Sequence, residues 1–310
     1  MSNQNFKLVS RLAPSPTGAL HLGNARTFLA NWLIVRSAGG KLQLRMDDLD
    51  GPRVKKGADA GVMEDLQWLG LAWDGPVVYQ SDNVDAHHAA LARLDVDGML
   101  YPDQRRRRDL LGAAAGRVAL DNAPLDAGDH RAQTLDPTGP VPTLRFAIPN
   151  DPITFVDALL GRRTFEPRAE LGDFIVRTRE GLPSYQLACV IDDHDALINH
   201  VVRGDDLLAS TGRQLALHRA LDLTPPTYTH LSLVIGADGR KLAKRHGDTR
   251  IAAYREAGVS SQRLLGVLAR WLGIDVGEET TPGELLEHFE LARVPTVPIV
   301  YDAANDPLLP

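Results

Sequence analysis

The stretch from residue 7 to residue 46 constrains the fold more than any other part of the sequence. Its first segment, KLVSRLA, is short and largely apolar, as expected of a buried parallel strand. The following PSPTG breaks regular structure, because proline fixes φ and glycine permits a sharp bend. Apolar residues then recur at helical spacing from His21 until the glycine pair at 39–40, and KLQLRM resumes a strand. This order predicts a βαβ unit whose helix N-terminus is open at the carboxyl ends of the strands.

The composition permits one large α/β domain with an appended module, because 310 residues can bury a stable core. The net charge of -6 means that any contact with RNA must use local patches. The single cysteine, Cys189, excludes an intramolecular disulfide and a cysteine-rich zinc site. The N-terminus has no signal-peptide pattern, and the apolar run FLANWLIV is too short to span a bilayer. We therefore expect a cytoplasmic protein with no membrane contact.

The opening turn of the predicted helix has the chemistry of a nucleotide site. His21 lies in this turn, and the missing side chain of Gly23 lets a phosphate or a flat ring approach the backbone. No GxGxxG is present, so the usual dinucleotide fingerprint is absent. The segment PSPTGALHLGN instead resembles the HIGH-type first signature of class I aminoacyl-tRNA synthetases. The run from Arg11 most closely resembles glutamyl-tRNA synthetases and their short paralogues.

Three other polar clusters admit more than one interpretation. The carboxylates within 47–50 could bind a metal or orient a cationic ligand, and the lack of an accompanying histidine favours the ligand. The pair His87–His88 on a predicted helix is interpreted as a solvated face. The segment DDHD at 192–195 could bind a metal, but a capping role at a helix end is favoured.

The region after residue 101 is predicted to be an insertion. Arg105 to Arg108 are either the solvated start of a helix or a contact to RNA phosphates. Residues 112–142 are rich in Gly, Ala, Pro and Asp, which indicates loops. TLRFAI and ITFVDALLGRRTFE then predict a three-stranded antiparallel patch with a turn near 160–161.

In the families resembled here, a zinc-binding knuckle often occupies this insertion. Asp103 and Arg105 stand where its C-x-C pair would be, and His130 stands where a later cysteine would be. Zinc needs about four N or S ligands. We therefore expect no protein-bound zinc.

The second half of the chain supplies a possible carboxylate site. PSYQLACVIDDH and NHVVRGDDLL resemble the glutamyl family. Arg203 ends an apolar strand, so its guanidinium would reach the crevice at the carboxyl ends of the strands, where a planar fork of donors suits a carboxylate. The alternative is an internal ion pair with Asp205 or Asp206.

The segment THLSLVIGADGRKLAKRHGD resembles the second signature of class I synthetases, the KMSKS loop, with Ala243 in place of its serine. Lys241 and Lys244 are charges suited to a triphosphate leaving group. SSQRLLGVLARWLGI is an amphipathic helix, and TPGELL begins another helix with a capping box.

The resemblance covers residues 7 to about 295 and implies the fold: α/β, with a class I synthetase Rossmann-type parallel sheet. An inserted α+β subdomain and a small C-terminal helical stem-contact module complete it. We expect the first half of the catalytic domain at 1–100 and the acceptor-type insertion at 101–170. The second half of the catalytic domain, with the KLAKR loop, should follow at 171–250, and the helical module at 251–310.

The resemblance also implies the reaction. About sixty residues follow KLAKR, so we expect no anticodon-reading domain, as in the glutamyl-queuosine tRNA(Asp) synthetases, and LRMDDLDGPR is closer to those short enzymes. They activate glutamate with ATP and Mg²⁺ without tRNA, then transfer it to queuosine at the wobble position of tRNA(Asp). We expect a monomer with glutamate, ATP and queuosine-containing tRNA(Asp) as partners. The alternatives are a truncated glutamyl-tRNA synthetase charging tRNA(Glu), and a non-catalytic paralogue that binds RNA or an amino acid.

Carried over residue by residue, the family's glutamate pocket falls on five positions, with two arginines facing carboxylates and an aspartate facing the ammonium: Arg11, Ser15, Asp47, Tyr185 and Arg203. The ATP contacts fall on His21, Gly23, Asn24, Lys241 and Lys244. His21 and Lys244 are the implied catalytic groups, because they would stabilise charge as pyrophosphate departs. Asp47 stands where the family usually has glutamate, so the ion pair to the ammonium would lengthen by about 1.5 Å unless the backbone shifts.

Overall fold

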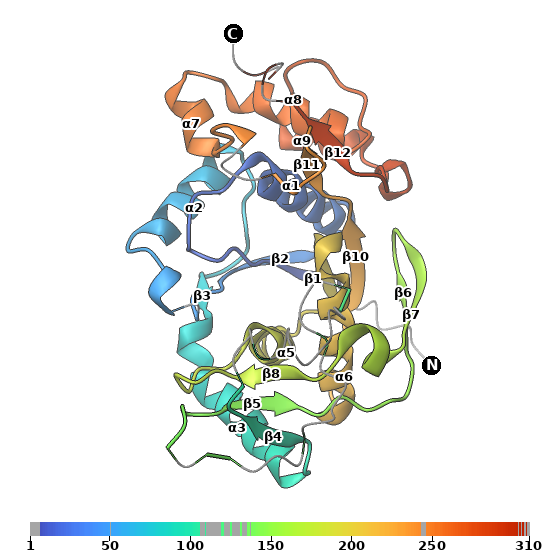
Figure 1. Ribbon diagram of the computed structural model, residues 1–310. Helices are drawn as coiled ribbons and strands as arrows, with labels where there is room; N and C mark the ends of the chain where they lie inside the picture. The colour runs from blue at the N-terminus through green and yellow to red at the C-terminus, as the bar shows by residue number, and fades with distance from the viewer. Residues whose placement is uncertain are drawn as a thin grey trace.

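Figure 1 shows a computed structural model of the chain, with the N-terminal βαβ unit in blue at the middle of the molecule. The structure describes residues 7–49, 51–105, 109, 119–120, 125, 131, 135–136, 138–242, 246–302, 304, 306 and 308. Strand β1 (Val9–Leu12), helix α1 (Leu22–Ser37) and strand β2 (Lys41–Met46) form the unit. β1 and β2 pair in parallel, with Leu12 opposite Leu44, as the sequence predicted.

Two sheets, one parallel and one mixed, together carry the core of the fold. The first has the order β1-β2-β3, with helix α2 (Ala58–Trp68) between β2 and β3 (Val78–Tyr79). The second has the order β7-β6-β10-β9, and three of its strands are parallel: β6 (Ile153–Asp157), β10 (Thr227–Leu231) and β9 (His200–Gly204). The sheets meet at the edge of β1, where the backbone N–H of Asn199 donates to the carbonyl of Val9 over 3.1 Å. Carboxyl ends of strands from both halves therefore converge.

The expected three-stranded patch is wrong in its pairing. Strand β5 (Thr143–Phe146) lies between β4 (Leu100–Asp103) and β8 (Phe174–Arg177) in a separate antiparallel sheet. Strands β6 and β7 (Gly161–Phe165) do form the predicted hairpin, but β6 joins β10 of the parallel sheet. Alternation of apolar residues indicates strands without naming their partners, which explains the error.

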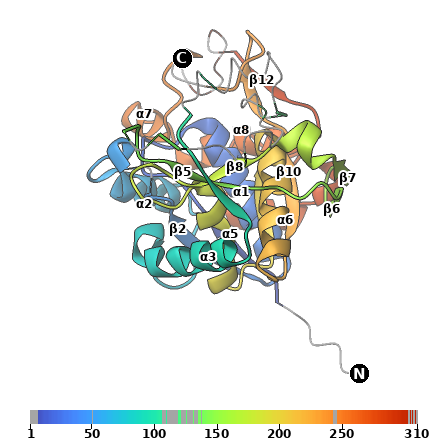
Figure 2. The same ribbon diagram turned by 60° about the horizontal axis from the view of Figure 1, so that its bottom comes forward.

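Helices α3 (Val84–Val96), α5 (Tyr185–Asp195) and α6 (Leu208–Ala220) cover the lower end of the molecule, where Figure 2 shows them side by side. The first of these corrects an interpretation of the sequence. His88 is exposed on α3, but His87 is fully buried, with its Nε2 2.7 Å from Asp192 Oδ1. Only His88 lies on a solvated face.

The chain after residue 232 packs on α1. Strand β11 (Val234–Gly236) pairs in parallel with β12 (Ile299–Tyr301). Between them lie α7 (Ile251–Glu256), α8 (Ser261–Trp271) and α9 (Pro282–His288). Leu264 and Leu268 of α8 are fully buried in the same hydrophobic core as Leu29 of α1. Thr281 and Glu284 form the predicted capping box at α9.

Short single-turn helices complete the described elements: Gly51–Arg53, Gln80–Asn83, Pro167–Leu171, Asp205–Leu207 and Leu291–Arg293.

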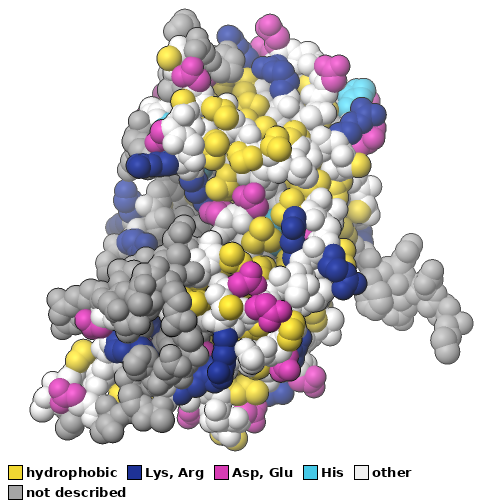
Figure 3. Space-filling model, turned by 45° about the vertical axis from the view of Figure 1, so that its right-hand side comes forward, with side chains coloured by type: hydrophobic (Ala, Val, Ile, Leu, Met, Phe, Trp, Pro, Cys, Tyr) yellow, Lys and Arg dark blue, Asp and Glu magenta, His cyan; other side chains and the backbone are white. Residues whose placement is uncertain are grey.

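The surface carries both signs of charge. On the face shown in Figure 3, Lys and Arg side chains are interspersed with Asp and Glu side chains. In the part of the chain that the structure describes, no helix has the length and apolar character needed to cross a membrane.

Candidate functional site

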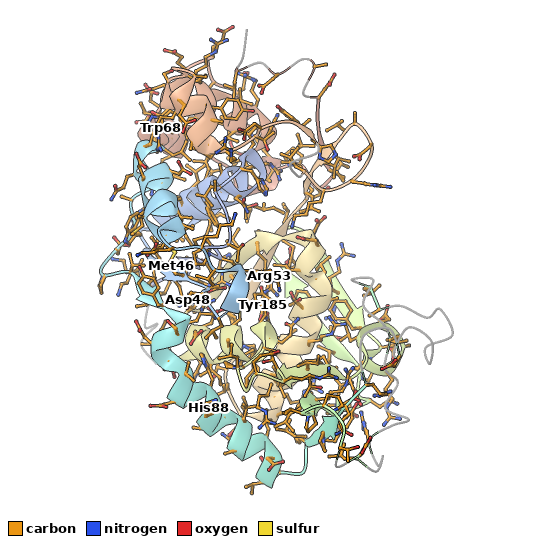
Figure 4. All side chains as sticks on the ribbon, turned by 60° about the vertical axis from the view of Figure 1, so that its left-hand side comes forward. Met46, Asp48, Arg53, Trp68, His88 and Tyr185 are labelled. Atoms are coloured by element: carbon orange, nitrogen blue, oxygen red, sulfur yellow. The ribbon has the colours of Figure 1, made fainter. Side chains whose placement is uncertain are left out.

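A cavity of about 580 Å³ opens where the carboxyl ends of β1, β2 and β9 face the N-termini of α1 and α5. It brings together nine of the ten site residues predicted from the sequence: Arg11, Ser15, His21, Gly23, Asn24, Asp47, Tyr185, Arg203 and Lys241. The tenth, Lys244, lies outside the described residues. Tyr185 begins α5 and lies near the middle of the molecule (Figure 4).

His21 is the N-cap of α1, and its ring orientation is set by the backbone. Its Nδ1 accepts hydrogen bonds from the N–H of Gly23 at 3.1 Å and of Asn24 at 3.4 Å. Burial, with a smaller effect of Lys241, lowers the pKa of His21 to about 4, so the ring is neutral near pH 7. Because Nδ1 is an acceptor, the proton lies on Nε2, which remains as a donor. A Cβ on Gly23 would lie 3.0 Å from the His21 ring, which explains the glycine at that position.

The helix N-terminus is less open than the sequence predicted. The first-turn amides of Gly23 and Asn24 are bound by His21, and the amide of Leu22 donates to the carbonyl of Thr249 over 3.0 Å. The imidazole therefore takes the place that a phosphate oxygen could occupy. What α1 offers to an anion is its dipole and the Nε2–H of His21.

Behind the cavity lies a buried cluster of two arginines and two aspartates. Asp193 Oδ1 lies 2.9 Å from Arg11 Nε and 2.5 Å from Arg45 Nη1, and Arg45 Nε lies 2.7 Å from Asp47 Oδ1. Burial alone would raise the pKa of Asp193, but the two arginines outweigh it and hold that pKa below its usual value. The four charges sum to zero and each carboxylate has a cationic partner, so no charge of the cluster is buried unpaired.

This cluster corrects the interpretation of DDHD as a cap. Asp193 is an ion-pair partner, and Asp192 accepts hydrogen bonds from Gln80 Nε2 at 2.7 Å and Asn83 Nδ2 at 2.9 Å. Both aspartates are buried in the last turns of α5 and point into the protein. In the described residues, no group of three or more His, Cys, Asp or Glu side chains could hold a metal ion.

Asp47 presents one oxygen to Arg45 and keeps the other for different partners. Its Oδ2 lies 3.9 Å from the Sγ of Cys189, a weak contact. Burial raises the pKa of Asp47, and Arg45 only partly offsets that effect. Since Asp47 lines the cavity, Oδ2 is the atom suited to an ammonium group there. Asp48 does not contribute to the cavity lining and binds Ser81 Oγ at 2.6 Å.

Arg203 reaches the cavity from the end of β9 and is 6% exposed. Its Nη2 donates to Thr211 Oγ1 at 2.6 Å, and its Nε donates to His230 Nε2 at 3.3 Å. The alternative ion pair with Asp205 or Asp206 is not found. Asp206 instead binds Lys241 Nζ at 2.5 Å.

In the inserted region, an ion pair stands where the zinc ligands of the resembled families would begin. The guanidinium of Arg105 donates twice to Asp103, with both distances 2.9 Å. Arg106 to Arg108, His130 and Asp50 lie outside the described residues.

Sequence reasoning missed four residues that shape the cavity's surroundings: Arg45, Asp157, Asp193 and His230. Arg45 lies in β2 and Asp47 follows the strand two positions later, a spacing that directs both side chains to the same side and that the sequence does contain. Asp157 and His230 are separated by 73 positions, and no local pattern joins them.

A profile of the family described as tRNA synthetases class I (E and Q), catalytic domain, matches residues 7–304. The chain belongs to this family of class I tRNA synthetases. It is therefore an aminoacyl-tRNA synthetase-like ligase with the α/β core that the sequence predicted.

Relatives within this class I family fall into two groups. The glutamyl-Q tRNA(Asp) synthetase of Symbiobacterium thermophilum is 43% identical, over 94% of this chain and 95% of the relative. Glutamate–tRNA ligase 2 of Syntrophus aciditrophicus is 38% identical over 94% of this chain, but the match spans 63% of that ligase. A solved glutamate tRNA ligase from Elizabethkingia meningosepticum, in complex with its amino acid, has a TM-score of 0.80 and 28% identity. That match covers 96% of this chain and 68% of the solved one.

Proposed function

We propose that this protein activates glutamate with ATP in the absence of tRNA and transfers the glutamyl group to queuosine at the wobble position of tRNA(Asp). The observation that carries the proposal is that one cavity is lined by Arg203, Asp47 and His21, side chains suited to a carboxylate, an ammonium group and a phosphate. The relative from Symbiobacterium thermophilum, named for glutamyl-Q tRNA(Asp) synthesis, supports the choice of acceptor.

The amino-acid half of the cavity is lined by side chains of both charge signs, as binding of glutamate requires. Arg203 receives the γ-carboxylate, Tyr185 adds a hydroxyl donor, and Arg11 faces the other carboxylate with Ser15 beside it. Asp47 Oδ2 receives the ammonium group. Together these contacts hold an α-carboxylate oxygen in line with the α-phosphorus of ATP, which is the main contribution of protein to such a transfer.

In the first step, a glutamate carboxylate oxygen forms a bond to the α-phosphorus, and the bond from that phosphorus to the β-bridging oxygen breaks. Pyrophosphate leaves, and the negative charge on it grows in the transition state. The Nε2–H of His21, the dipole of α1 and the ammonium groups of Lys241 and Lys244 stabilise that charge. Gly23 and Asn24 contact the nucleotide, and ATP enters as its Mg²⁺ complex.

In the second step, a hydroxyl of the queuosine cyclopentenediol attacks the activated carbonyl carbon and AMP leaves, while the hydroxyl proton passes to solvent. The inserted segment 101–170 and the helical segment 251–310 are the parts that we assign to RNA contact. Their local basic groups must act without a basic field from the whole molecule, since the net charge is -6.

The first test is glutamate-dependent exchange of pyrophosphate into ATP with no tRNA present. We expect exchange at a rate that tRNA does not increase. Exchange that begins only after tRNA is added contradicts the proposal and favours a conventional glutamyl-tRNA synthetase. No exchange under either condition favours a non-catalytic paralogue.

The second test separates the acceptors. Radiolabelled glutamate is offered with tRNA(Asp) that contains queuosine, with the same tRNA that contains guanine at that position, and with tRNA(Glu). We expect label on the first alone, in a linkage that survives removal of the tRNA 3′ end. Label on tRNA(Glu) that is lost with the 3′ end contradicts the proposed acceptor.

A further inference from the structure

Three side chains lie in a row across the parallel sheet, from its outer hairpin to the cavity. Asp157 ends β6, His230 lies on the neighbouring β10, and Arg203 lies directly opposite His230 on β9. His230 Nδ1 is 2.7 Å from Asp157 Oδ2, and Arg203 Nε is 3.3 Å from His230 Nε2. All three are buried, with Asp157 1% exposed and His230 fully enclosed.

The contacts determine where the protons of this row lie. Asp157 also accepts backbone N–H bonds from Leu159 at 3.0 Å and Leu160 at 2.9 Å. Burial alone would raise its pKa, but the hydrogen bonds from His230 and the backbone hold that pKa below its usual value. Burial lowers the pKa of His230, although Asp157 opposes this effect. His230 is therefore neutral, with its proton on Nδ1 facing Asp157 and a lone pair on Nε2 facing Arg203.

Thr211 of α6 closes the arrangement. Its Oγ1 accepts from Arg203 Nη2 at 2.6 Å and lies 2.8 Å from His230 Nε2. Two nitrogens of the guanidinium are thus held by neutral groups. Nη1 makes no hydrogen bond with the described part of the chain, and Arg203 lines the cavity.

The neutral ring has an electrostatic consequence. A protein carboxylate in direct contact with Arg203 would orient the guanidinium, but it would also neutralise the charge that a substrate carboxylate needs. Here the imidazole separates Asp157 from Arg203, so the side chain is oriented while no carboxylate of the described residues pairs with it. By contrast, Arg11 and Arg45 share the carboxylates of Asp47 and Asp193. A buried, unpaired guanidinium gains most from a carboxylate ligand.

We propose that Asp157, His230 and Thr211 are positioning residues that hold Arg203 with its Nη1 edge toward the amino-acid subsite and leave its charge for the side-chain carboxylate of the substrate. They touch neither glutamate nor ATP, and they determine the preference for an acidic amino acid through Arg203. This inference rests on the proposed function.

The first experiment removes the hydroxyl while keeping the shape of the side chain. In pyrophosphate exchange, Thr211→Val should raise the KM for glutamate by about tenfold or more, because a hydrogen bond to a charged group is lost. The KM for ATP should stay as in the wild type, whereas the midpoint of thermal unfolding should fall by a few degrees, because the buried Nη2 of Arg203 loses its acceptor. Exchange is therefore measured well below that midpoint. Thr211→Ser should restore the glutamate KM. Thr154→Val, at an exposed threonine of β6, is the matched control and should change nothing.

The second experiment changes the tautomer. In Asp157→Asn the amide can donate to His230 Nδ1, which moves the ring proton to Nε2 and turns a donor toward the donors of Arg203. We expect the preference for glutamate over glutamine, as a ratio of kcat/KM, to fall at least tenfold. Nitrogen NMR of the histidines, with His230 assigned by comparison with His230→Gln, should show protonated Nδ1 in the wild type and protonated Nε2 in Asp157→Asn.

The outcomes separate this inference from the proposed function. If Arg203→Lys leaves the glutamate KM unchanged, the proposed glutamate pocket is wrong. If Arg203→Lys raises the glutamate KM, the proposed glutamate pocket is supported. If Thr211→Val then leaves that KM unchanged and Asp157→Asn leaves the preference for glutamate unchanged, the positioning inference is overturned. A wild-type spectrum with the proton of His230 on Nε2 overturns it whatever the activity.

Discussion

At the scale of single residues, the arginines near the cavity differ in how far their charges are already satisfied. Arg11 and Arg45 are held by Asp193 and Asp47, whereas the contacts of Arg203 within the described chain are to neutral groups. A carboxylate ligand therefore gains more from Arg203 than from its neighbours. In the proposed glutamate pocket, Asp47, which is one methylene shorter than the family's usual glutamate, should affect the ammonium end and leave the side-chain end unchanged.

The pocket should accept amino acids in the order glutamate, aspartate, glutamine. The NH₂ of glutamine would face a guanidinium that has only donors, and an unpaired buried charge costs several kcal/mol. Aspartate keeps the charge and loses one methylene, usually worth about 1–3 kcal/mol. Exchange rates with all three amino acids test this order, and Arg203→Ala should abolish most of the preference for acids. A wild type that prefers glutamine, or ratios unchanged in Arg203→Ala, contradicts the assignment.

Cys189 should be inert in the native protein. Its side chain is 1% exposed, and burial with the nearby Asp47 raises the pKa of the thiol to about 12. Because the thiolate is the reactive species, iodoacetamide at pH 8 should modify it very slowly in the native state and rapidly in denaturant. It is the only cysteine of the chain, so the intact mass reports its modification directly. Rapid modification without denaturant would contradict the packing around Asp47.

At the scale of elements, α2 carries a carboxylate in an unfavourable place. Asp65 lies in the last turn of the helix, near the negative end of its dipole, and its side chain is 2% exposed. Burial raises its pKa from 3.8 to about 6, although Arg255 at 3.2 Å opposes the shift. The folded state therefore binds this proton more tightly than the unfolded state. The contribution of Asp65 to stability should therefore fall as the pH rises from about 4 to about 6 and then level off.

Asp65→Asn should accordingly stabilise the protein above pH 6. We expect a gain of about 1–3 kcal/mol in the free energy of unfolding at pH 7.5, because the cost of the buried charge is removed. The gain should shrink as the pH is lowered toward 4, where the wild type is protonated. Urea unfolding at pH 7.5 and pH 4.5 measures both values. Glu64→Gln, at a neighbouring side chain that is 66% exposed, is the control and should have little effect. A variant less stable than the wild type at pH 7.5 would show that the ion pair with Arg255 outweighs burial.

At the scale of the whole molecule, the C-terminal helices and the HIGH-type helix share one core. Leu268 of α8 is fully buried with Leu29 and Leu33 of α1. Arg26 of α1, 1% exposed, donates from Nε to the carbonyl of Trp271 at 3.1 Å and from Nη1 to that of Ser232 at 2.5 Å. The orientation of α1, and so of His21, depends on a segment 245 positions away.

Leu268→Ala should therefore lower both stability and activation. Truncation of a fully buried leucine costs about 2–5 kcal/mol, since it removes contacts and leaves a cavity. We expect this loss in urea unfolding, together with a lower exchange rate at temperatures where the variant is still folded. Arg270→Ala, at an exposed position of the same helix, serves as the control. Loss of stability with unchanged exchange would mean that α8 supports the fold without orienting α1.

The sequence by itself determined the local parts of this protein. The βαβ unit, the start of α1 at His21 and the β6–β7 hairpin all follow from spacing, caps and turn residues within a few positions of one another. The family resemblance also indicated ten site residues, and nine of them line the cavity, although their roles in catalysis remain predictions.

Only the tertiary structure decided the partners of these residues. Arg45 and Asp193 are 148 positions apart, His87 and Asp192 are 105 apart, and β6 joins β10 instead of β5. Periodicity tells which face of an element is apolar, but it does not tell which other element covers that face. Charged side chains that look solvated in the sequence become buried pairs once packing removes water from both, because an unpaired charge there would be too costly to keep.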